Sequence, residues 1–266
     1  MAGGLTNPAA LLSRFRSSLT LNRWRLELLR RLKGETLWNR CGGYWLPFHG
    51  DGDLQEVQYQ LEGELWFKWE TERLREYLPK DGVVIDVGAN LGFAVLLFAK
   101  HVGPGGQIYA FEPSPLVYTK LLEVVEKNQL RYVQCFNLGC GTVQREETLL
   151  VPASSGNATI KRSGVHPAGV SREINIKIDT LDHVILPLAR KIDFLKIDTE
   201  GFEDQVLAGA VELVARDRPV VYLELSQEYG DSSARAIAWL RARGYTFDRD
   251  PDLALAKNGD NFLAIP

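Results

Sequence analysis

Three carboxylates stand at the ends of predicted strands in the second half of the chain. Asp198 and Glu200 follow the predicted strand Ile192 to Ile197, and Glu224 lies at the end of a later strand. The carboxyl ends of parallel strands form the edge at which open α/β sheets bind ligands. A carboxylate at that edge can take the proton of a hydroxyl as a general base. We therefore expect Asp198, Glu200 and Glu224 to be catalytic, with Asp198 as the base or as a group that orients the substrate.

The same residue types allow two other interpretations. Clustered carboxylates can hold Mg²⁺, which prefers oxygen ligands. Glu200 and Glu203 can instead lie at the N-terminus of the following helix, where negative charge is favourable. No decisive ligand spacing selects a metal, so metal-free catalysis, a Mg²⁺ site and a structural role all stay open. His166 and His183 are weaker candidates for a base, because a lone histidine is ordinarily a surface residue or already hydrogen-bonded.

A turn with two glycines, Gly88 and Gly92, lies earlier in the chain, and we call it the glycine turn. A buried strand, a tight turn and the start of a helix are predicted by Val83-Val84-Ile85-Asp86-Val87-Gly88-Ala89-Asn90-Leu91-Gly92-Phe93. Gly88 and Gly92 allow positive φ or close approach of the backbone, and amides at a helix N-terminus can receive an anionic group. A dinucleotide-binding turn needs the pattern G-x-G-x-x-G, but here Asn90 replaces its second glycine and its third glycine is absent. The turn therefore favours a nucleotide-like ligand other than NAD.

Glu112 is the candidate for binding a ribose. The predicted strand Gln107 to Phe111 ends in Glu112-Pro113, about 20 residues beyond the glycine turn, where related folds place an acidic residue against the ribose hydroxyls. Pro113 ends the strand, and Ser114 is predicted to cap the helix that follows. The alternative is a solvated glutamate in a loop.

The order of these motifs resembles that of the FkbM family of S-adenosylmethionine (SAM) dependent methyltransferases, over most of residues 60–266. The resemblance is carried by Asp86 to Gly92, Phe111-Glu112-Pro113, Leu181-Asp182, Lys196 to Glu203, Trp69-Glu70, the strand end at Glu224 and Asn261 to Pro266. It implies that the glycine turn holds the methionine end of SAM. The implied cofactor contacts are Glu70, Asp86, Gly88, Ala89, Asn90, Gly92, Phe93, Glu112, Pro113, Asn137 and Asp198.

The chain departs from the family after the third predicted strand, Val133 to Asn137. Family members commonly carry an acidic residue shortly downstream, whereas this chain has Gly139-Cys140-Gly141-Thr142. We therefore expect backbone amides and apolar packing, rather than a side chain, to contact the adenine.

The function that the resemblance implies is transfer of a methyl group from SAM. The leading expectation is O-methylation of a hydroxyl on a sugar, glycan or secondary metabolite. Two alternatives stay open, which are N- or C-methylation of another small acceptor and a non-catalytic SAM-binding scaffold.

The chain is long enough for one enzyme domain with an N-terminal extension. It has 266 residues, of which 45% are hydrophobic, and we assign residues 1–79 to the extension and 80–266 to the SAM-binding domain. Strands and helices alternate after Val83, which predicts an α/β fold with a mostly parallel sheet and helices on both faces. The segments 245–247 and 261–265 are expected to form an antiparallel pair at its end. A short β element at 44–48, a helix at 66–78 and a loop at 152–170 that contacts substrate complete the prediction.

Composition excludes several other classes. The net charge of −3 gives no reason to expect a nucleic-acid partner. Three cysteines are too few and too unevenly spaced for a disulfide framework or a zinc site, which favours a reducing cytoplasm. No apolar run reaches the roughly 18 residues of a membrane span. Residues 14–33 carry seven basic residues against one acid at helical spacing, so this segment could contact an anionic membrane or pack on its own domain.

Overall fold

The computed structural model describes residues 37–41, 43–48, 72–152, 159–160, 170–188, 190–225, 231–251 and 260–266. The chain divides into two units, Met1–Trp66 and Phe67–Pro266. In the first unit, β1 (Leu37–Cys41) pairs antiparallel with β2 (Tyr44–Phe48), which confirms the β element predicted at 44–48. The basic segment at 14–33 and the predicted cofactor contact Glu70 lie outside the described residues.

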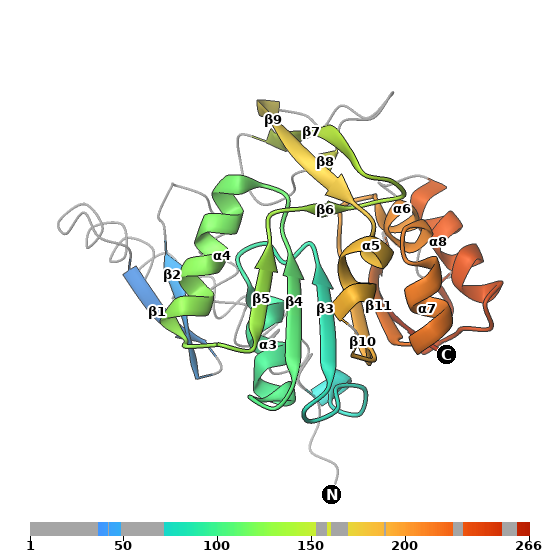
Figure 1. Cartoon of the computed structure of the whole chain (residues 1–266), viewed down its shortest axis with the longest axis horizontal. Helices are drawn as coiled ribbons and strands as arrows, with labels where there is room; N and C mark the ends of the chain where they lie inside the picture. Colours follow the sequence, from blue (N-terminus) through green and yellow to red (C-terminus); the bar gives the residue numbers. More distant parts are fainter. Residues whose placement is uncertain are drawn as a thin grey trace, which may run out of the picture. The chain divides into compact units, whose positions relative to one another are not determined.

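A seven-stranded sheet forms the centre of the second unit. Its strands are β3 (Val83–Val87), β4 (Gln107–Phe111), β5 (Val133–Phe136), β10 (Phe194–Ile197), β11 (Val220–Leu225), β12 (Thr246–Phe247) and β13 (Asp260–Ile265), in the order β12-β13-β11-β10-β3-β4-β5. The pairs from β11 to β5 are parallel, and β13 is antiparallel to both β11 and β12. The predicted α/β sheet with its antiparallel final pair is therefore confirmed (Figure 1).

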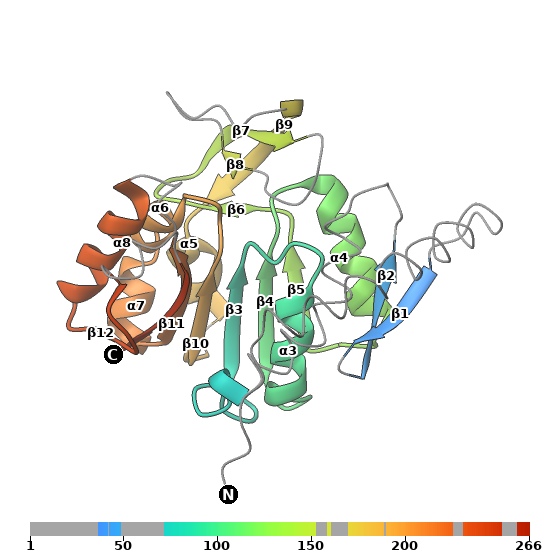
Figure 2. The same ribbon diagram turned by 180° about the vertical axis from the view of Figure 1, so that it is seen from behind.

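Helices cover both faces of this sheet, as Figures 1 and 2 show. They are α3 (Phe93–Val102), α4 (Pro115–Lys127), α5 (Leu181–Ile185), α6 (Glu203–Ala208), α7 (Val211–Asp217) and α8 (Asp231–Arg241), with a short 3₁₀ helix at Leu186–Leu188. Apolar residues of α5 to α8 pack with one face of the strands, and those of α3 and α4 pack with the other. Of the helix predicted at 66–78, residues 72–74 are helical and 66–71 lie outside the described part. In these ranges no helix has both the length and the apolar character needed to cross a bilayer.

A second sheet lies beyond the carboxyl ends of β3, β4 and β5 in both views (Figures 1 and 2). It contains β6 (Gly139–Cys140), β7 (Arg145–Pro152), β8 (Thr159–Ile160) and β9 (Val170–Asp179), in the order β6-β9-β7-β8. Its small core includes Phe202, which follows the predicted catalytic carboxylates. This second sheet was not among the predicted elements. The loop expected at 152–170 is interrupted by β8, and the rest of that loop lies outside the described residues.

Candidate active site

Strand register brings the predicted site residues together. Lys196 on β10 is the register partner of Asp86 on β3 and of Tyr222 on β11. Side chains two residues apart along a strand point to the same face. Asp198 and Glu224 follow Lys196 and Tyr222 by two positions, so they lie on that same face, one layer nearer the carboxyl edge. The sheet therefore presents Asp86 and Lys196 in one layer, with Asp198 and Glu224 in the next.

Lys196 bridges two carboxylates inside the sheet. Its Nζ lies 3.1 Å from Asp86 Oδ1 and 3.1 Å from Asp198 Oδ2, and only 6% of its side chain is exposed. Burial lowers the pKa of Lys196, but the carboxylates of Asp198 and Asp86 outweigh burial and raise it above its ordinary value. Lys196 is therefore a cation at neutral pH. Burial raises the pKa of Asp86, and the Lys196 ammonium opposes that rise.

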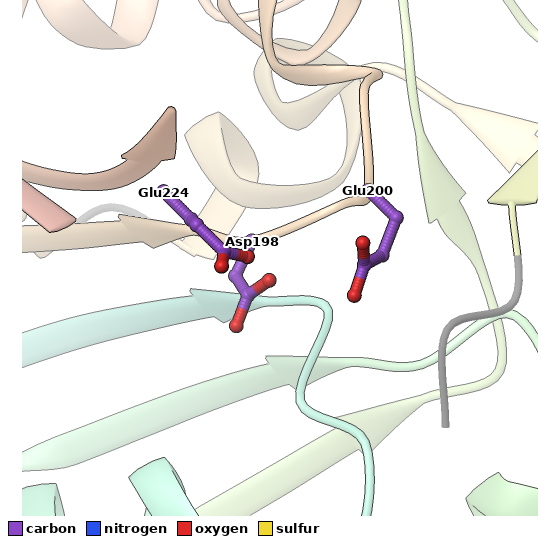
Figure 3. A group of neighbouring side chains, drawn as sticks. All are labelled: Asp198, Glu200 and Glu224. Carbon is purple, nitrogen blue, oxygen red and sulfur yellow. The ribbon is translucent and has the colours of Figure 1, made fainter. Parts of the chain in front are cut away.

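Asp198, Glu200 and Glu224 form an acidic cluster in which one carboxylate oxygen of each residue lies within 4.8 Å of the other two (Figure 3). Burial and the neighbouring carboxylate of Asp198 raise the pKa of Glu224 to about 9, so Glu224 is protonated near pH 7 and donates a hydrogen bond to Asp198. Burial alone would raise the pKa of Asp198, but Lys196 and the hydrogen bond from Glu224 outweigh burial and lower it. In this cluster Asp198 is thus an ionised carboxylate, and Glu224 is a protonated carboxylic acid. A cation bound among the three side chains would favour loss of the Glu224 proton, because a nearby positive charge stabilises the ionised carboxylate.

Glu203 shapes the loop that carries Glu200. Glu200 and Gly201 have φ values of 53° and 98°, so the chain turns sharply there. The fully buried Glu203 carboxylate accepts hydrogen bonds from Thr199 Oγ1 at 3.0 Å, Gly201 N at 2.9 Å and Ser232 Oγ at 3.2 Å. Glu203 is also the first residue of α6, where a negative charge was expected. Its carboxylate holds the turn in place and so directs Glu200 toward Asp198.

Replacing Glu203 by alanine is expected to lower the free energy of unfolding by about 3 kcal/mol. The substitution leaves the buried donors of Thr199, Gly201 and Ser232 without their acceptor, and unsatisfied buried donors are costly. Urea denaturation measures this change. Glu212→Ala, at an exposed position of α7, is the matched control and should change stability by no more than about 0.5 kcal/mol. Equal stabilities of the two variants would contradict the role given to Glu203.

The glycine turn packs against the strand end that carries Asp198. Gly88 has φ 79°, and a Cβ added there would lie 1.8 Å from the backbone oxygen of Asp198. The N–H groups of Gly88 and Ala89 donate to Phe111 O at 3.0 and 2.9 Å. Gly92, with φ 88°, is the N-cap of α3, which begins at the predicted contact Phe93. The turn is therefore fixed between β4 and the acidic cluster.

Glu112 ties the glycine turn to the end of β4. Its carboxylate is 7% exposed and accepts hydrogen bonds from Asn90 N at 3.0 Å and Ser114 N at 2.9 Å. Burial raises the pKa of Glu112 to about 7, although these two hydrogen bonds oppose the rise. Asn137 Nδ2 donates to the backbone oxygens of Glu112 and Pro113 at 2.9 and 3.0 Å, so this amide holds the strand end.

The prediction that the Ser114 side chain caps α4 is wrong. Ser114 occupies the N-cap position, but its side chain makes no capping hydrogen bond. Its backbone N–H donates to Glu112 instead, because the Glu112 carboxylate turns back over the chain that follows it. Neither histidine joins the acidic cluster among the described residues: His183 is 69% exposed beside Asp179, and His166 lies outside that part of the chain.

Comparison with known families agrees with this arrangement. Residues 86–247, more than half of the chain, match the model of the Methyltransferase FkbM domain. The chain belongs to the FkbM methyltransferase family. The matched segment contains every predicted site residue except Glu70. It also contains Lys196 and Glu203, to which the sequence analysis gave no catalytic or binding role.

Two similar proteins are about a quarter identical to this chain over the regions that align with it. AMB antimetabolite synthetase AmbE of Pseudomonas aeruginosa is 27% identical over 251 residues, which are 79% of this chain but 12% of AmbE. The 31-O-demethyl-FK506 methyltransferase FkbM of Streptomyces tacrolimicus is 26% identical, covering 66% of this chain and 77% of that protein. A crystal structure of methyltransferase FkbM from Methylobacillus flagellatus KT matches with 15% identity and a TM-score of 0.48, covering 80% of this chain and 55% of that one.

One motif of the FkbM resemblance lies away from the acidic cluster. Asp182, in α5, accepts hydrogen bonds from the N–H groups of Glu212 and Leu213 at 2.9 and 2.8 Å. These are among the first N–H groups of α7, which have no partner within the helix. Asp182 therefore joins α5 to α7 and supports the face of the sheet opposite Lys196.

Proposed function

We propose that this FkbM family member transfers the methyl group of SAM to a hydroxyl oxygen of a small acceptor, such as a sugar, a glycan or a secondary metabolite. The observation that carries the proposal is the state of Asp198. Its pKa is held low by Lys196, its side chain is 37% exposed, and it lies against the glycine turn. A base in this position is ionised at neutral pH and can be reached by an acceptor.

The residues present fit SAM. Both carboxylate oxygens of Asp86 are buried, and beyond the Lys196 ammonium, which lies 3.1 Å from Oδ1, they have no hydrogen-bond partner among the described residues. Glu112 retains lone pairs beyond its two backbone hydrogen bonds. The donors of SAM include an ammonium group and two ribose hydroxyls, which suit carboxylate acceptors. Asp86, Glu112 and the glycine turn would therefore hold the cofactor.

Asp198 would act as the base. When bound, SAM supplies an electrophilic methyl group on a sulfonium, and the sulfur leaves as a neutral thioether. Asp198 accepts the proton that the acceptor hydroxyl loses as the oxygen gains the methyl group. The hydrogen bond from Glu224 and the ion pair with Lys196 keep Asp198 ionised before that step. Oxygen as the acceptor atom is also supported by the name of the Streptomyces relative, which describes a 31-O-demethyl compound.

Calorimetric titration of the purified protein tests the proposal. The ligands are SAM and NAD⁺, each with and without Mg²⁺, followed by transfer of labelled methyl from SAM to a library of hydroxyl and amine compounds. We expect micromolar binding of SAM, no response to NAD⁺ and label in hydroxyl compounds. Absence of SAM binding would reject the proposal, and label only in amines would reject oxygen as the acceptor atom. A requirement for Mg²⁺ would replace base catalysis by a metal site at the acidic cluster.

SAM binding is expected to strengthen about tenfold between pH 6 and pH 8. With a pKa of about 7, Glu112 is mostly protonated at pH 6 and mostly ionised at pH 8. Only the ionised carboxylate can accept hydrogen bonds from both ribose hydroxyls, so affinity rises as the pH passes the pKa from below. Titrations at both pH values measure the effect. Glu112→Gln should bind more weakly and lose this pH dependence, whereas an unchanged pH dependence in that variant would remove Glu112 as its source.

A further inference from the structure

Lys196 interrupts an otherwise apolar strand. Its neighbours Leu195 and Ile197 are fully buried and pack into the main core. The lysine points to the opposite face, and its side chain is almost as inaccessible to water. Burial of an ammonium group is costly unless other groups replace its lost hydration. A lysine at this position therefore needs compensating acceptors.

Three oxygen atoms surround this ammonium. Asp86 Oδ1 and Asp198 Oδ2 each lie 3.1 Å from Lys196 Nζ, and Gly88 O accepts a hydrogen bond at 3.5 Å. An ammonium has three protons, so these acceptors match its full capacity as a donor. They belong to three separate parts of the site, namely β3, the glycine turn and the end of β10.

Backbone contacts also connect the end of β10 to the end of β3. Asp198 N donates to Val87 O at 3.1 Å, which continues the pairing of β10 with β3 beyond the last strand residue. Gly88 leaves no room for a side chain beside Asp198 O. The main chain thus fixes where the Asp198 Cα lies, whereas the direction of its carboxylate depends on side-chain contacts, of which the ion pair with Lys196 is one.

We propose that Lys196 is a positioning residue that fixes the carboxylate of Asp198 relative to the glycine turn. The inference rests on the proposed function, because Lys196 acts through Asp198. One ammonium thereby sets the geometry between the base and the loop that would hold the methyl donor. A lysine that only neutralised one carboxylate would need one contact. Lys196 instead contacts Asp86 on β3, Gly88 in the glycine turn and Asp198 at the end of β10.

A double-mutant cycle in the cofactor-free protein tests the contact. The variants are Lys196→Met, Asp198→Asn and the double variant, compared by calorimetric melting temperature. Lys196→Met should lower that temperature by about 10 °C, because it leaves buried carboxylates without their cation. The double variant should melt no lower than Lys196→Met alone, since asparagine removes the repelling charge. Additive losses would overturn the proposal. Lys177→Met, at an exposed position of β9, is the matched control and should melt like the wild type.

Turnover separates positioning from general support of the fold. With the acceptor found in the screen, Lys196→Met should lower kcat at least 30-fold while the KM for the acceptor stays within threefold. In the Asp198→Asn background the same substitution should cost no further kcat, and losses that multiply would overturn the proposal. If Lys196→Met does not fold, Lys196→Met with Asp86→Asn removes the Lys196–Asp86 ion pair, and Asp198→Asn is then compared within the Asp86→Asn background at saturating SAM, with and without Lys196→Met.

The two proposals can fail separately. Absence of SAM binding in the wild type rejects the proposed function, and the melting cycle still decides whether Lys196 and Asp198 act together. SAM binding together with additive melting losses rejects the role of Lys196 alone.

Discussion

Replacing Gly88 by alanine is expected to lower the free energy of unfolding by about 3 to 5 kcal/mol. A residue with a side chain pays about 1 to 2 kcal/mol for the left-handed backbone that Gly88 adopts at φ 79°. The added Cβ would also lie 1.8 Å from Asp198 O, and forcing an atom into a packed region costs about 1 to 3 kcal/mol or more. The obstacle is backbone, so no side-chain rotation relieves it. Chemical denaturation measures the loss.

Gly244 provides the matched control for this substitution. It has φ 77°, and the nearest atom to an added Cβ is the end of the Arg218 side chain at 3.8 Å. Gly244→Ala should therefore show the backbone penalty alone, about 1 to 2 kcal/mol. Equal losses of stability in the two variants would mean that a Cβ added at Gly88 does not clash with the backbone oxygen of Asp198. SAM binding should fall in Gly88→Ala and persist in Gly244→Ala.

Replacing Asp198 by asparagine is expected to lower turnover by a factor of about 10² or more, with SAM affinity nearly unchanged. Asparagine keeps the shape of the side chain but cannot accept the hydroxyl proton, and a general base typically contributes at least this factor. The measurement compares kcat for the acceptor with the dissociation constant for SAM. Turnover equal to that of the wild type would end the role of Asp198 as the base.

Glu224→Gln is the informative comparison, because it makes the same chemical change one strand away. Glu224 is protonated near neutral pH and donates a hydrogen bond to Asp198. The glutamine amide can also donate, so this variant should lose less than tenfold in turnover. A loss as large as that of Asp198→Asn would mean that Glu224 is ionised during catalysis, as in a site where the cluster binds a cation.

The central sheet could be predicted because its signals are local. Each strand from Val83 to Val87, Gln107 to Phe111 and Val133 to Phe136 is a short run bounded by turn residues, and the structure places strands there. The second sheet was missed although β9 contains the alternation Glu173-Ile174-Asn175-Ile176-Lys177-Ile178, which is typical of a half-buried strand. The alternation alone does not say which strand β9 pairs with, and its partners β6 and β7 lie in a segment with weaker strand patterns.

The predicted catalytic carboxylates lie close together, because the carboxyl ends of adjacent parallel strands lie side by side at one edge of the sheet. The contacts that set their charge states could not be predicted, because they depend on register between distant segments. Lys196 and Gly88 are 108 residues apart, and no local pattern states that their strands are neighbours in register. Glu203 was expected near the start of a helix. The groups that donate hydrogen bonds to its carboxylate, however, lie in the preceding turn and at Ser232, which is 29 residues later in α8. Side-chain hydrogen bonds of this kind require the folded coordinates.

The position of β13 has a consequence for how the protein is made. This strand pairs antiparallel with β11, and its Asn261 is the register partner of Glu224. Until β13 has emerged from the ribosome, β11 can pair with β10 only. The strand that carries Glu224 is then the edge of the sheet. Pairings between such distant segments form late and slowly during folding. Asp86 on β3 and Lys196 on β10 are also far apart in the chain, so their ion pair can form only once β10 has joined β3.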